Sequence, residues 1–328
     1  MIRSAYSAPD GTIRFDLEPD EIDPTLQLKA GLLWLDLVGE APEDCRPLLQ
    51  ETFGFHPLAV EDALDETHGP KVDDWGSYLY LVLHAIAFKA GDDEPLRTLE
   101  LDLFLGKNYL VTYQAEPIAA LDRLWADCRR DERHLQRGTG RLLYDLADEM
   151  VDGYMPAVEA IDEAIDRVED EIFGQPGHTL LARIFALKRA LLNLRRIIAP
   201  QREVLNKLAR GDYAVVEAGD RIFFRDVYDH LVRLHDITEG LRDLVSGALD
   251  TYLSVVSNRM NEVMKTLTII TTLFMPISFL VGFFGTNFFQ PAAPLEAWTS
   301  RPAFVIVLVT MVLLPAAMFL WMRKRAWM

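Results

Sequence analysis

The chain contains few cysteines and few basic residues for its length. Cys45 and Cys128 are its two cysteines, and no C-x-x-C pair occurs, which argues against a disulfide framework or a thiolate zinc site and fits a reducing compartment. The 328 residues include 33 lysines and arginines against 50 aspartates and glutamates, for a net charge of −17. Nucleic acids and anionic lipid headgroups are bound by basic surfaces, so neither is expected as the main partner. Such an acidic chain is suited to binding cations. Alternatively, its acidic surface only keeps the domain soluble.

The usual constellations of an active site are also missing. The seven histidines form no H-x-x-x-H or H-E-x-x-H pair, and no glycine-rich phosphate loop precedes a predicted helix. An enzyme with a membrane anchor would normally show one of these patterns, so we do not expect an enzyme. Residues 1–24 are polar and contain no apolar signal region, and we expect no cleaved export signal.

Two long apolar runs lie near the end of the chain, at Met264–Phe284 and Ala303–Met322. Each has about 20 residues, enough for a helix to cross the ~30 Å hydrocarbon layer of a membrane. Lys265 is the one charged residue within them. The runs predict two membrane-spanning helices that follow a soluble part of about 260 residues.

Basic residues flank these runs on one side only. Arg259 and Lys265 stand at the start of the first run, and Arg323–Arg325 directly follow the second, whereas Arg301 is the one basic residue between Thr286 and Pro302. By the positive-inside rule, both termini are expected in the cytoplasm and the connection between the two runs outside. The expected location of the chain is the inner (plasma) membrane.

The first 115 residues have the pattern of a mixed α/β domain. Short helices are expected at Glu43–Phe53 and Pro57–Glu66, and hairpin turns at Gly91–Asp93 and Gly106–Asn108. Segments rich in β-branched, aromatic or alternating apolar residues predict the strands. They are Thr12–Leu17, Leu32–Leu37, Tyr78–Phe88, Leu96–Leu105 and Tyr109–Tyr113.

After Glu116 the pattern becomes helical. One helix carries a packing seam with 3-4 spacing, at Val158, Ile161, Ile165, Val168 and Ile172. The many acids beside this seam indicate a solvated helix face first and a cation-attracting surface second. A second helix is expected from Thr179 to Leu208. A third runs from Arg221 to Phe284 with Pro276 as its one proline, and would be roughly 95 Å long.

Small, polar and flexible residues form one stripe along the last part of this long helix. They recur with 3-4 spacing, at Asn261, Met264, Thr268, Thr271, Met275, Ser278, Gly282 and Gly285. Several such helices around an axis would direct the stripe into a water-filled pore. A seam between packed helices collects small residues too, and the pattern alone leaves both interpretations open. In a pore, Met264 and Leu267 would form apolar constrictions that close by dewetting. On the cytoplasmic side of these constrictions, a ring of Asp250 carboxylates would concentrate cations. Alternatively, Asp250 is an ordinary solvated helix residue.

Five stretches together resemble the CorA magnesium/cobalt transporter family. They are Ser257–Lys265 (SNRMNEVMK), Phe283–Phe288 (FFGTNF), Phe53–Asp62 (FGFHPLAVED), Pro70–Val72 (PKV) and Phe224–Asp229 (FRDVYD). The family has a pore helix that ends in Tyr-Gly-Met-Asn, two spans near the C-terminus and a basic tail. The resemblance covers the whole chain.

The resemblance implies a funnel-shaped homopentamer of α+β class, embedded in membrane lipid and lined by the long helices. It implies cytosolic domains at 1–115 (α/β) and 116–262 (helical bundle and stalk), spans at 263–284 and 303–322, an outer loop at 285–302 and a cytoplasmic tail at 323–328. Gly285, Thr286 and Asn287 would form the selectivity filter. Thr286 stands where the family has Met, and Phe284 where it has Tyr, so the preferred ion stays open between Mg²⁺, Co²⁺, Ni²⁺ and Zn²⁺.

In the family, divalent ions bound between neighbouring cytosolic domains hold the pore closed. The matching carboxylates are Glu61, Asp62, Asp148 and Asp226, which the resemblance makes regulatory Mg²⁺ ligands. Without the resemblance, Glu61 and Asp62 would be ordinary surface acids, and Asp226 a partner of Arg225 or Arg221.

Two alternatives to an Mg²⁺/Co²⁺ channel remain from the sequence. One is a membrane oligomer with a sealed centre, in which the polar stripe is only a packing seam. The other is proton-coupled Zn²⁺ uptake like that of the related ZntB transporters, which also vary the middle position of the filter.

Overall fold

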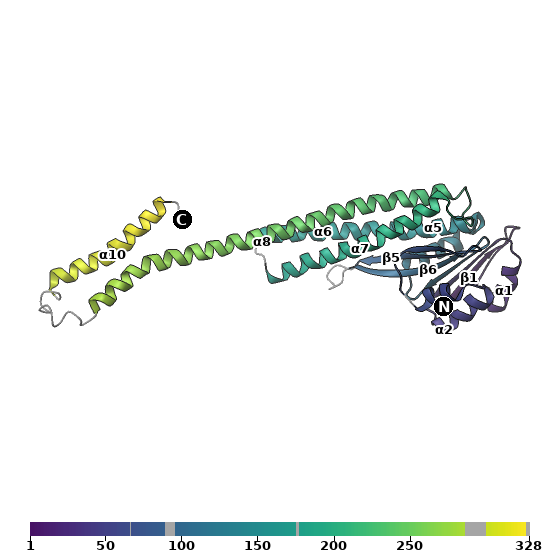
Figure 1. Ribbon diagram of the computed structural model, residues 1–328, viewed down its shortest axis with the longest axis horizontal. Coiled ribbons are helices and arrows are strands. Elements are labelled where there is room, and N and C mark those ends of the chain that lie inside the picture. The colour runs from purple at the N-terminus through teal and green to yellow at the C-terminus, as the bar shows by residue number, and fades with distance from the viewer. Residues whose placement is uncertain (66, 89–95, 175–176, 286–299, 326–328) are drawn as a thin grey trace. The chain divides into compact units, whose positions relative to one another are not determined.

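The computed structural model describes residues 1–65, 67–88, 96–174, 177–285 and 300–325. Its internal contacts divide the chain into two compact units, Met1–Thr251 and Tyr252–Met328. One continuous helix, α8 (Arg221–Gly285), contributes to both units (Figure 1). Its 65 residues correspond to about 98 Å at the α-helical rise, and the predicted long helix is confirmed.

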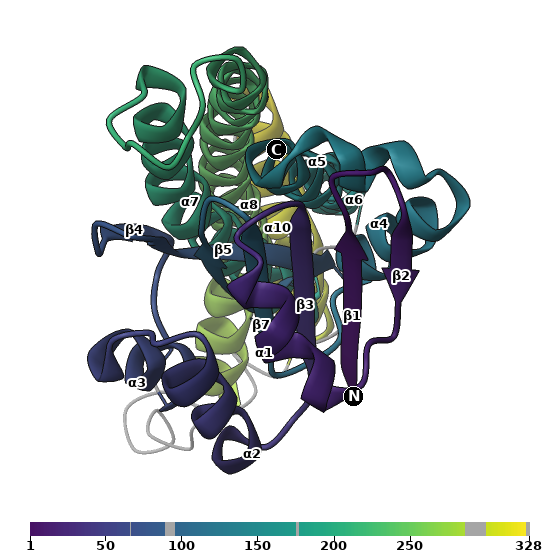
Figure 2. The same ribbon diagram turned by 90° about the vertical axis from the view of Figure 1, so that its right-hand side faces the viewer.

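A seven-stranded mixed sheet forms the centre of the first unit, with the order β2-β1-β3-β7-β6-β5-β4 (Figure 2). Strands β3 and β7 pair in parallel, and every other neighbouring pair is antiparallel. The strands are β1 (Ile2–Ser7), β2 (Ile13–Phe15), β3 (Leu32–Val38), β4 (Lys71–Asp74), β5 (Leu79–Phe88), β6 (Leu96–Leu105) and β7 (Tyr109–Gln114). The parallel pair places β3, from the first part of the chain, beside β7, which is the last strand of the sheet in the sequence.

Most of the predicted strands are confirmed to within one residue, and Leu96–Leu105 at both ends. The expected strand Thr12–Leu17 is shorter and runs from Ile13 to Phe15. The hairpin at Gly106–Asn108 is confirmed, since the Gly106 amide donates to the Tyr109 carbonyl at 2.9 Å. The expected turn at Gly91–Asp93 lies outside the described residues. Strands β1 and β4 and helix α1 were not predicted, because their sequences are too polar or contain proline.

Short helices cover one face of the sheet. They are α1 (Pro19–Gln27), α2 (Pro42–Pro47), the π-helical turn η1 (Leu48–Thr52) and α3 (Pro57–Asp65), so the helix expected at Glu43–Phe53 changes from α to π geometry in its middle. Tyr80, Val82 and Phe104 point to this face and pack with Leu49 and Val60 in one buried cluster. The alternate residues of the same strands point to the opposite face, as the pleat of a strand requires.

Longer helices cover that opposite face, where α5, α6 and α7 contact the sheet. The helical part contains α4 (Ala119–Arg130), the 3₁₀ turn η2 (Glu132–Arg137), α5 (Thr139–Asp152), α6 (Tyr154–Phe173) and α7 (His178–Arg210). The predicted seam of α6 is confirmed, since Val158, Ile161, Ile165, Val168 and Ile172 are all buried. Gly211 ends α7 in the left-handed conformation at φ 76°, which glycine adopts without steric cost.

The second unit contains the end of α8 and helix α10 (Arg301–Lys324). Both helices are long and apolar enough to cross a membrane, and in the most apolar 18-residue stretch of each, no residue is buried by the chain itself. A soluble helix of this composition would bury one face. The two apolar helices therefore need a covering that a single chain does not supply.

A buried ion pair joins the first strand to the core of the sheet. The Arg3 Nε donates to Asp36 Oδ2 at 2.9 Å, and the Asp36 side chain has 0 % exposure. Thr112 Oγ1 at 2.7 Å and Gln114 Nε2 at 3.1 Å also donate to Asp36. Each partner offsets part of the cost of burying the carboxylate. This network explains why the polar segment Ile2–Ser7 is held as an inner strand.

We predict that Arg3→Met destabilises the first unit strongly, because it leaves Asp36 as a buried charge without its ionic partner. Removal of one partner of a buried pair costs about 3–5 kcal/mol, so the thermal midpoint of the detergent-solubilised protein should fall by ~10 °C. Arg97→Met is the matched control, since Arg97 pairs with Glu116 at the surface. Equal midpoints for the two variants would contradict the role of the buried pair.

Candidate functional site: acidic clusters and the polar face of α8

The carboxylates predicted as metal ligands lie in two places of the first unit. Glu61 and Asp62 belong to α3, whereas Asp148 belongs to α5 and Asp226 to α8. Among the described residues, no hydrogen bond or ion pair joins the α3 acids to Asp148 or Asp226. The one set of converging ligand groups found among those residues contains Asp148 without Glu61, Asp62 or Asp226, and a meeting of the four carboxylates across an interface stays a prediction.

Asp62 already has cationic partners within its own chain. Lys71 Nζ lies 2.5 Å and His68 Nε2 3.4 Å from Asp62 Oδ2. Burial raises the pKa of Asp62, but the hydrogen bonds and charges of Lys71 and His68 outweigh it and hold the pKa below its ordinary value. Glu61 is exposed. Asp62 is thus an ionised carboxylate whose charge Lys71 neutralises, a pairing that the sequence analysis did not foresee.

Asp148 lies in a second cluster, which joins α5 to α8. Ligand atoms of Asp148, Asp152 and His230 all lie within 4.8 Å of one another. Burial raises the pKa of Asp148, and the negative charges of Asp152 and Asp226 raise it further, while the nearby His230 opposes them. The cluster is therefore a place where several acids converge and where positive charge is favoured.

Asp226 is exposed and lies one helical turn before His230 on α8. In the described part of the chain it forms no ion pair with Arg225 or Arg221, the partners considered from the sequence. Its negative charge instead acts on Asp148 and Tyr144. Asp226 thus belongs to the margin of the α5–α8 cluster.

Asp152 and His230 were missed by the sequence analysis. Asp148 and Asp152 are four residues apart and lie on one face of a helix, a spacing visible in the sequence. His230 follows Asp226 by four residues in the same way. The contact between the two helices is tertiary, and the sequence gives no sign of it.

The predicted polar stripe of α8 is exposed along its whole length, from Asn261 to Gly285. Half-buried residues lie on the opposite side of the same helix; they are Ile269, Thr272, Leu273, Pro276, Ile277 and Leu280. The stripe therefore faces away from the side that the chain itself covers. Asp250, further toward the N-terminus of α8, is also exposed.

Thr268 shows how a hydroxyl is accommodated in this helix. Its Oγ1 donates to the Met264 carbonyl at 2.7 Å, four residues back. The hydroxyl hydrogen is thus satisfied within the helix, while the oxygen keeps lone pairs that can accept a hydrogen bond from water. The exposed Thr268 oxygen is therefore available as an acceptor beside the apolar Met264.

The predicted filter is described in part. Gly285 is the last residue of α8, and beyond its chain neighbours and the backbone of its own helix, no atom of the described residues lies within 4 Å of the position that a Cβ would occupy there. Thr286 and Asn287 lie outside the described residues, as does most of the expected outer loop.

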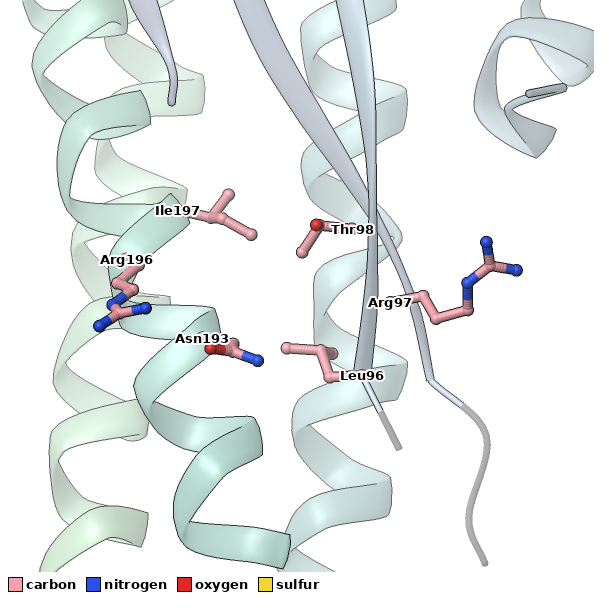
Figure 3. A pocket seen from close by; sticks show the side chains of 6 residues that line it. All are labelled: Leu96, Arg97, Thr98, Asn193, Arg196 and Ile197. Atoms are coloured by element: carbon pink, nitrogen blue, oxygen red, sulfur yellow. The ribbon is translucent and has the colours of Figure 1, made fainter. Parts of the chain in front are cut away.

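A separate pocket between β6 and α7 does not have the chemistry of a cation site. It is lined by Leu96, Arg97, Thr98, Asn193, Arg196 and Ile197 (Figure 3). Its described lining residues include Arg196 and no carboxylate, and the Arg97 side chain points away from the other lining residues. A divalent cation would be repelled there, so the acidic clusters and the α8 stripe remain the candidate site.

Two uncovered apolar helices, a polar stripe on one of them and acidic clusters in the preceding unit define a class of protein: one that lies in a membrane and handles cations. The family described as CorA-like Mg²⁺ transporter protein matches residues 29–324. The chain belongs to this family of transporters, and the resemblance seen in the sequence is confirmed. The family is a class of transporters, not of enzymes.

Relatives whose names give different ions match along most of the chain. The cobalt/magnesium transport protein CorA of Thermotoga maritima is 36% identical over 90% of this chain and 83% of its own length. The zinc transport protein ZntB of Yersinia pseudotuberculosis is 25% identical over 90% of this chain and 88% of its own. The structure of the CorA magnesium transporter of Methanocaldococcus jannaschii has the same fold, with a TM-score of 0.84 over 100% of this chain and 99% of its own at 22% identity.

Proposed function

We propose that the chain is one subunit of a funnel-shaped homopentameric channel that imports Mg²⁺ and Co²⁺ across the inner (plasma) membrane, with both termini in the cytoplasm. The observation that carries this proposal is the stripe on α8, which faces away from the side that its own chain covers. In lipid, exposed Thr, Ser and Asn side chains gain nothing, whereas around a central axis they line water. The 36% identity to a cobalt/magnesium transport protein supports the choice of ions.

The residues of the stripe divide the proposed pore into functional sections. Asp250 and Asn261 stand at the cytoplasmic side, where a ring of carboxylates concentrates cations. Met264 and Leu267 form apolar constrictions that close the pore by dewetting. Thr268, Thr271, Met275, Ser278 and Gly282 line the section between these constrictions and the filter.

The proposed filter is formed by Gly285, Thr286 and Asn287 at the outer mouth. Mg²⁺ loses its coordinated waters reluctantly. Amide oxygens from several Asn287 side chains accept hydrogen bonds from those waters and so select the hydrated ion without stripping it. The hydroxyl oxygens of the stripe, of which Thr268 is the described example, then accept from the same waters as the ion moves inward.

Inward movement needs no ATP in this account. A unit charge gains about 2.3 kcal/mol per 100 mV of membrane potential, so a divalent ion gains ~4.6 kcal/mol. The concentration of ions inside supplies the control. Glu61 and Asp62 of one subunit and Asp148 and Asp226 of its neighbour bind a divalent ion between them, and depletion of that ion leaves carboxylates that repel each other.

Proton-coupled Zn²⁺ uptake is the second candidate function. The identity to zinc transport protein ZntB over most of the chain favours it, as does Thr286 in place of the family's Met. A pH gradient drives such uptake, whereas a channel responds to voltage and ion gradients alone.

We predict that Asn287→Ala reduces Mg²⁺ flux into proteoliposomes at least ~10-fold, because the ring of amide acceptors at the filter is lost. The oligomer should survive, as judged by size-exclusion chromatography with light scattering. Asn193→Ala, in the first unit, is the matched control and should conduct like the wild type. Wild-type flux through the Asn287 variant would overturn the filter assignment.

We predict that Lys71→Met strengthens closure by internal Mg²⁺, because Lys71 competes with the ion for Asp62. A partly exposed ion pair contributes up to about 1 kcal/mol, so the Mg²⁺ concentration that halves the flux should fall about two- to fivefold. Lys107→Met removes the same charge from an exposed loop and should leave this concentration unchanged. The same value in both variants and the wild type would show that Lys71 does not compete with the ion.

A further inference from the structure

Helices α6 and α7 pack on each other and carry opposite charges. Helix α6 contains seven acids and one arginine. Helix α7 contains eight lysines and arginines and one acid, in a chain that is acidic as a whole. The apolar seam of α6 is buried, and its acids lie off this seam. The sequence alone favours a solvated face for these acids, but the basic neighbour gives them a second interpretation.

Ion pairs within the chain leave most of this charge uncompensated. Arg183 Nη1 of α7 lies 2.6 Å from Glu171 Oε2 of α6. In the part of the chain that the structure describes, neither Arg189 nor Arg196 forms an ion pair. The same holds for the exposed acids in the middle of α6, which we call the acidic face. They are Glu159, Asp162, Glu163, Asp166 and Asp170.

The acidic face is unfavourable on a helix that has only water beside it. Asp162, Asp166 and Asp170 follow one another at four-residue spacing, which places their carboxylates next to one another on the helix surface. Like charges at that spacing destabilise a helix. Salt and water only screen this repulsion, whereas a basic surface laid against the acids replaces it by attraction.

The exposed face of α7 combines positive charge with apolar surface. Phe185, Arg189, Leu192 and Arg196 recur with 4-3-4 spacing and therefore share one face of the helix; we call them the basic face. Phe185 and Leu192 are 40 % and 41 % exposed, and they alternate with the two unpaired arginines. Arginine and aromatic side chains are enriched where proteins contact each other, so this face has the composition of an interface.

The two faces match each other in charge and in length. Along α6, Asp162 and Asp170 are about 12 Å apart, and along α7, Arg189 and Arg196 are about 10.5 Å apart, at the α-helical rise. A ring of identical subunits uses two different surfaces at every contact, one from each neighbour. The acidic and basic faces, on two helices of the same unit, supply such a complementary pair.

We propose that the basic face of α7 docks against the acidic face of α6 in a neighbouring copy of this chain. The inference rests on the proposed ring of subunits, and it adds the surfaces by which neighbouring subunits recognise each other. This contact contains no metal ion. It therefore holds the subunits together when the Mg²⁺ ions between them are lost and the pore opens.

The first test is a disulfide crosslink between two full-length copies with different affinity tags, co-expressed and purified in detergent. One copy carries Asp166→Cys and the other Leu192→Cys, at the middle of the two faces. The native Cys45 and Cys128 are buried. Because a disulfide needs Cα atoms within about 7 Å, oxidation should join the two tags at least ~5-fold more than in a control pair. The control combines Asp166→Cys with Leu28→Cys, an exposed leucine outside both faces.

Charge reversal is a second and independent test. Arg189→Glu combined with Arg196→Glu should raise the protein concentration at which half of the oligomer dissociates at least ~10-fold, because like charges then face each other. Asp162→Lys combined with Asp166→Lys should have the same effect. When the two variants are mixed, they should associate again, since each contact between unlike chains joins opposite charges. Light scattering of the detergent-solubilised protein measures all three samples.

The proposal is overturned if the first cysteine pair crosslinks no better than its control, or if charge reversal leaves the dissociation unchanged. A basic face that bound anionic lipid headgroups instead would give the first of these results. Wild-type oligomers that conduct Mg²⁺ would still support the proposed transport function in either case. A wild-type protein that is monomeric would contradict both.

Discussion

Helix α8 has more apolar surface than its own chain can bury, and the rest of the structure depends on this constraint. The most apolar stretches of α8 and α10 contain no residue that is buried by the chain. Lipid can cover the apolar side of such helices, but it cannot accommodate the polar stripe at no cost. In the proposed function, membrane insertion covers the apolar side of α8, and association of several subunits around a pore lets the polar stripe contact water.

The first unit provides the opposite environment, a well-packed core with charge at its surface. Its sheet is covered by short helices on one face and by α5–α7 on the other, which holds α5 beside α8 and brings Asp148 and Asp152 to His230. The same unit pairs Asp62 of α3 with Lys71. Metal binding between subunits would thus have to compete with a neutralising pair that each subunit already contains.

Local patterns predicted much of this fold. Strands such as Leu96–Leu105 and the long helix α8 were predictable because their periodicity reflects one buried face or one apolar medium. Strand β1 was not, because its inner residues include Arg3 and Ser4, whose burial depends on Asp36 and other partners far along the chain. The carboxylates of the candidate site were predicted from the family resemblance, and the polar stripe of α8 was predicted from its helical spacing. Asp152 and His230 needed the packing of α5 on α8, which no local pattern encodes.

The central claim is that a membrane potential alone drives Mg²⁺ through a pore lined by α8. The most direct test is uptake into proteoliposomes, with Mg²⁺, Co²⁺, Ni²⁺ and Zn²⁺ offered separately under an imposed voltage, with and without a pH gradient. The account predicts entry of Mg²⁺ and Co²⁺ that follows the voltage and is indifferent to the pH gradient. Zn²⁺ entry that follows the proton gradient, with no Mg²⁺ entry at any voltage, would contradict it.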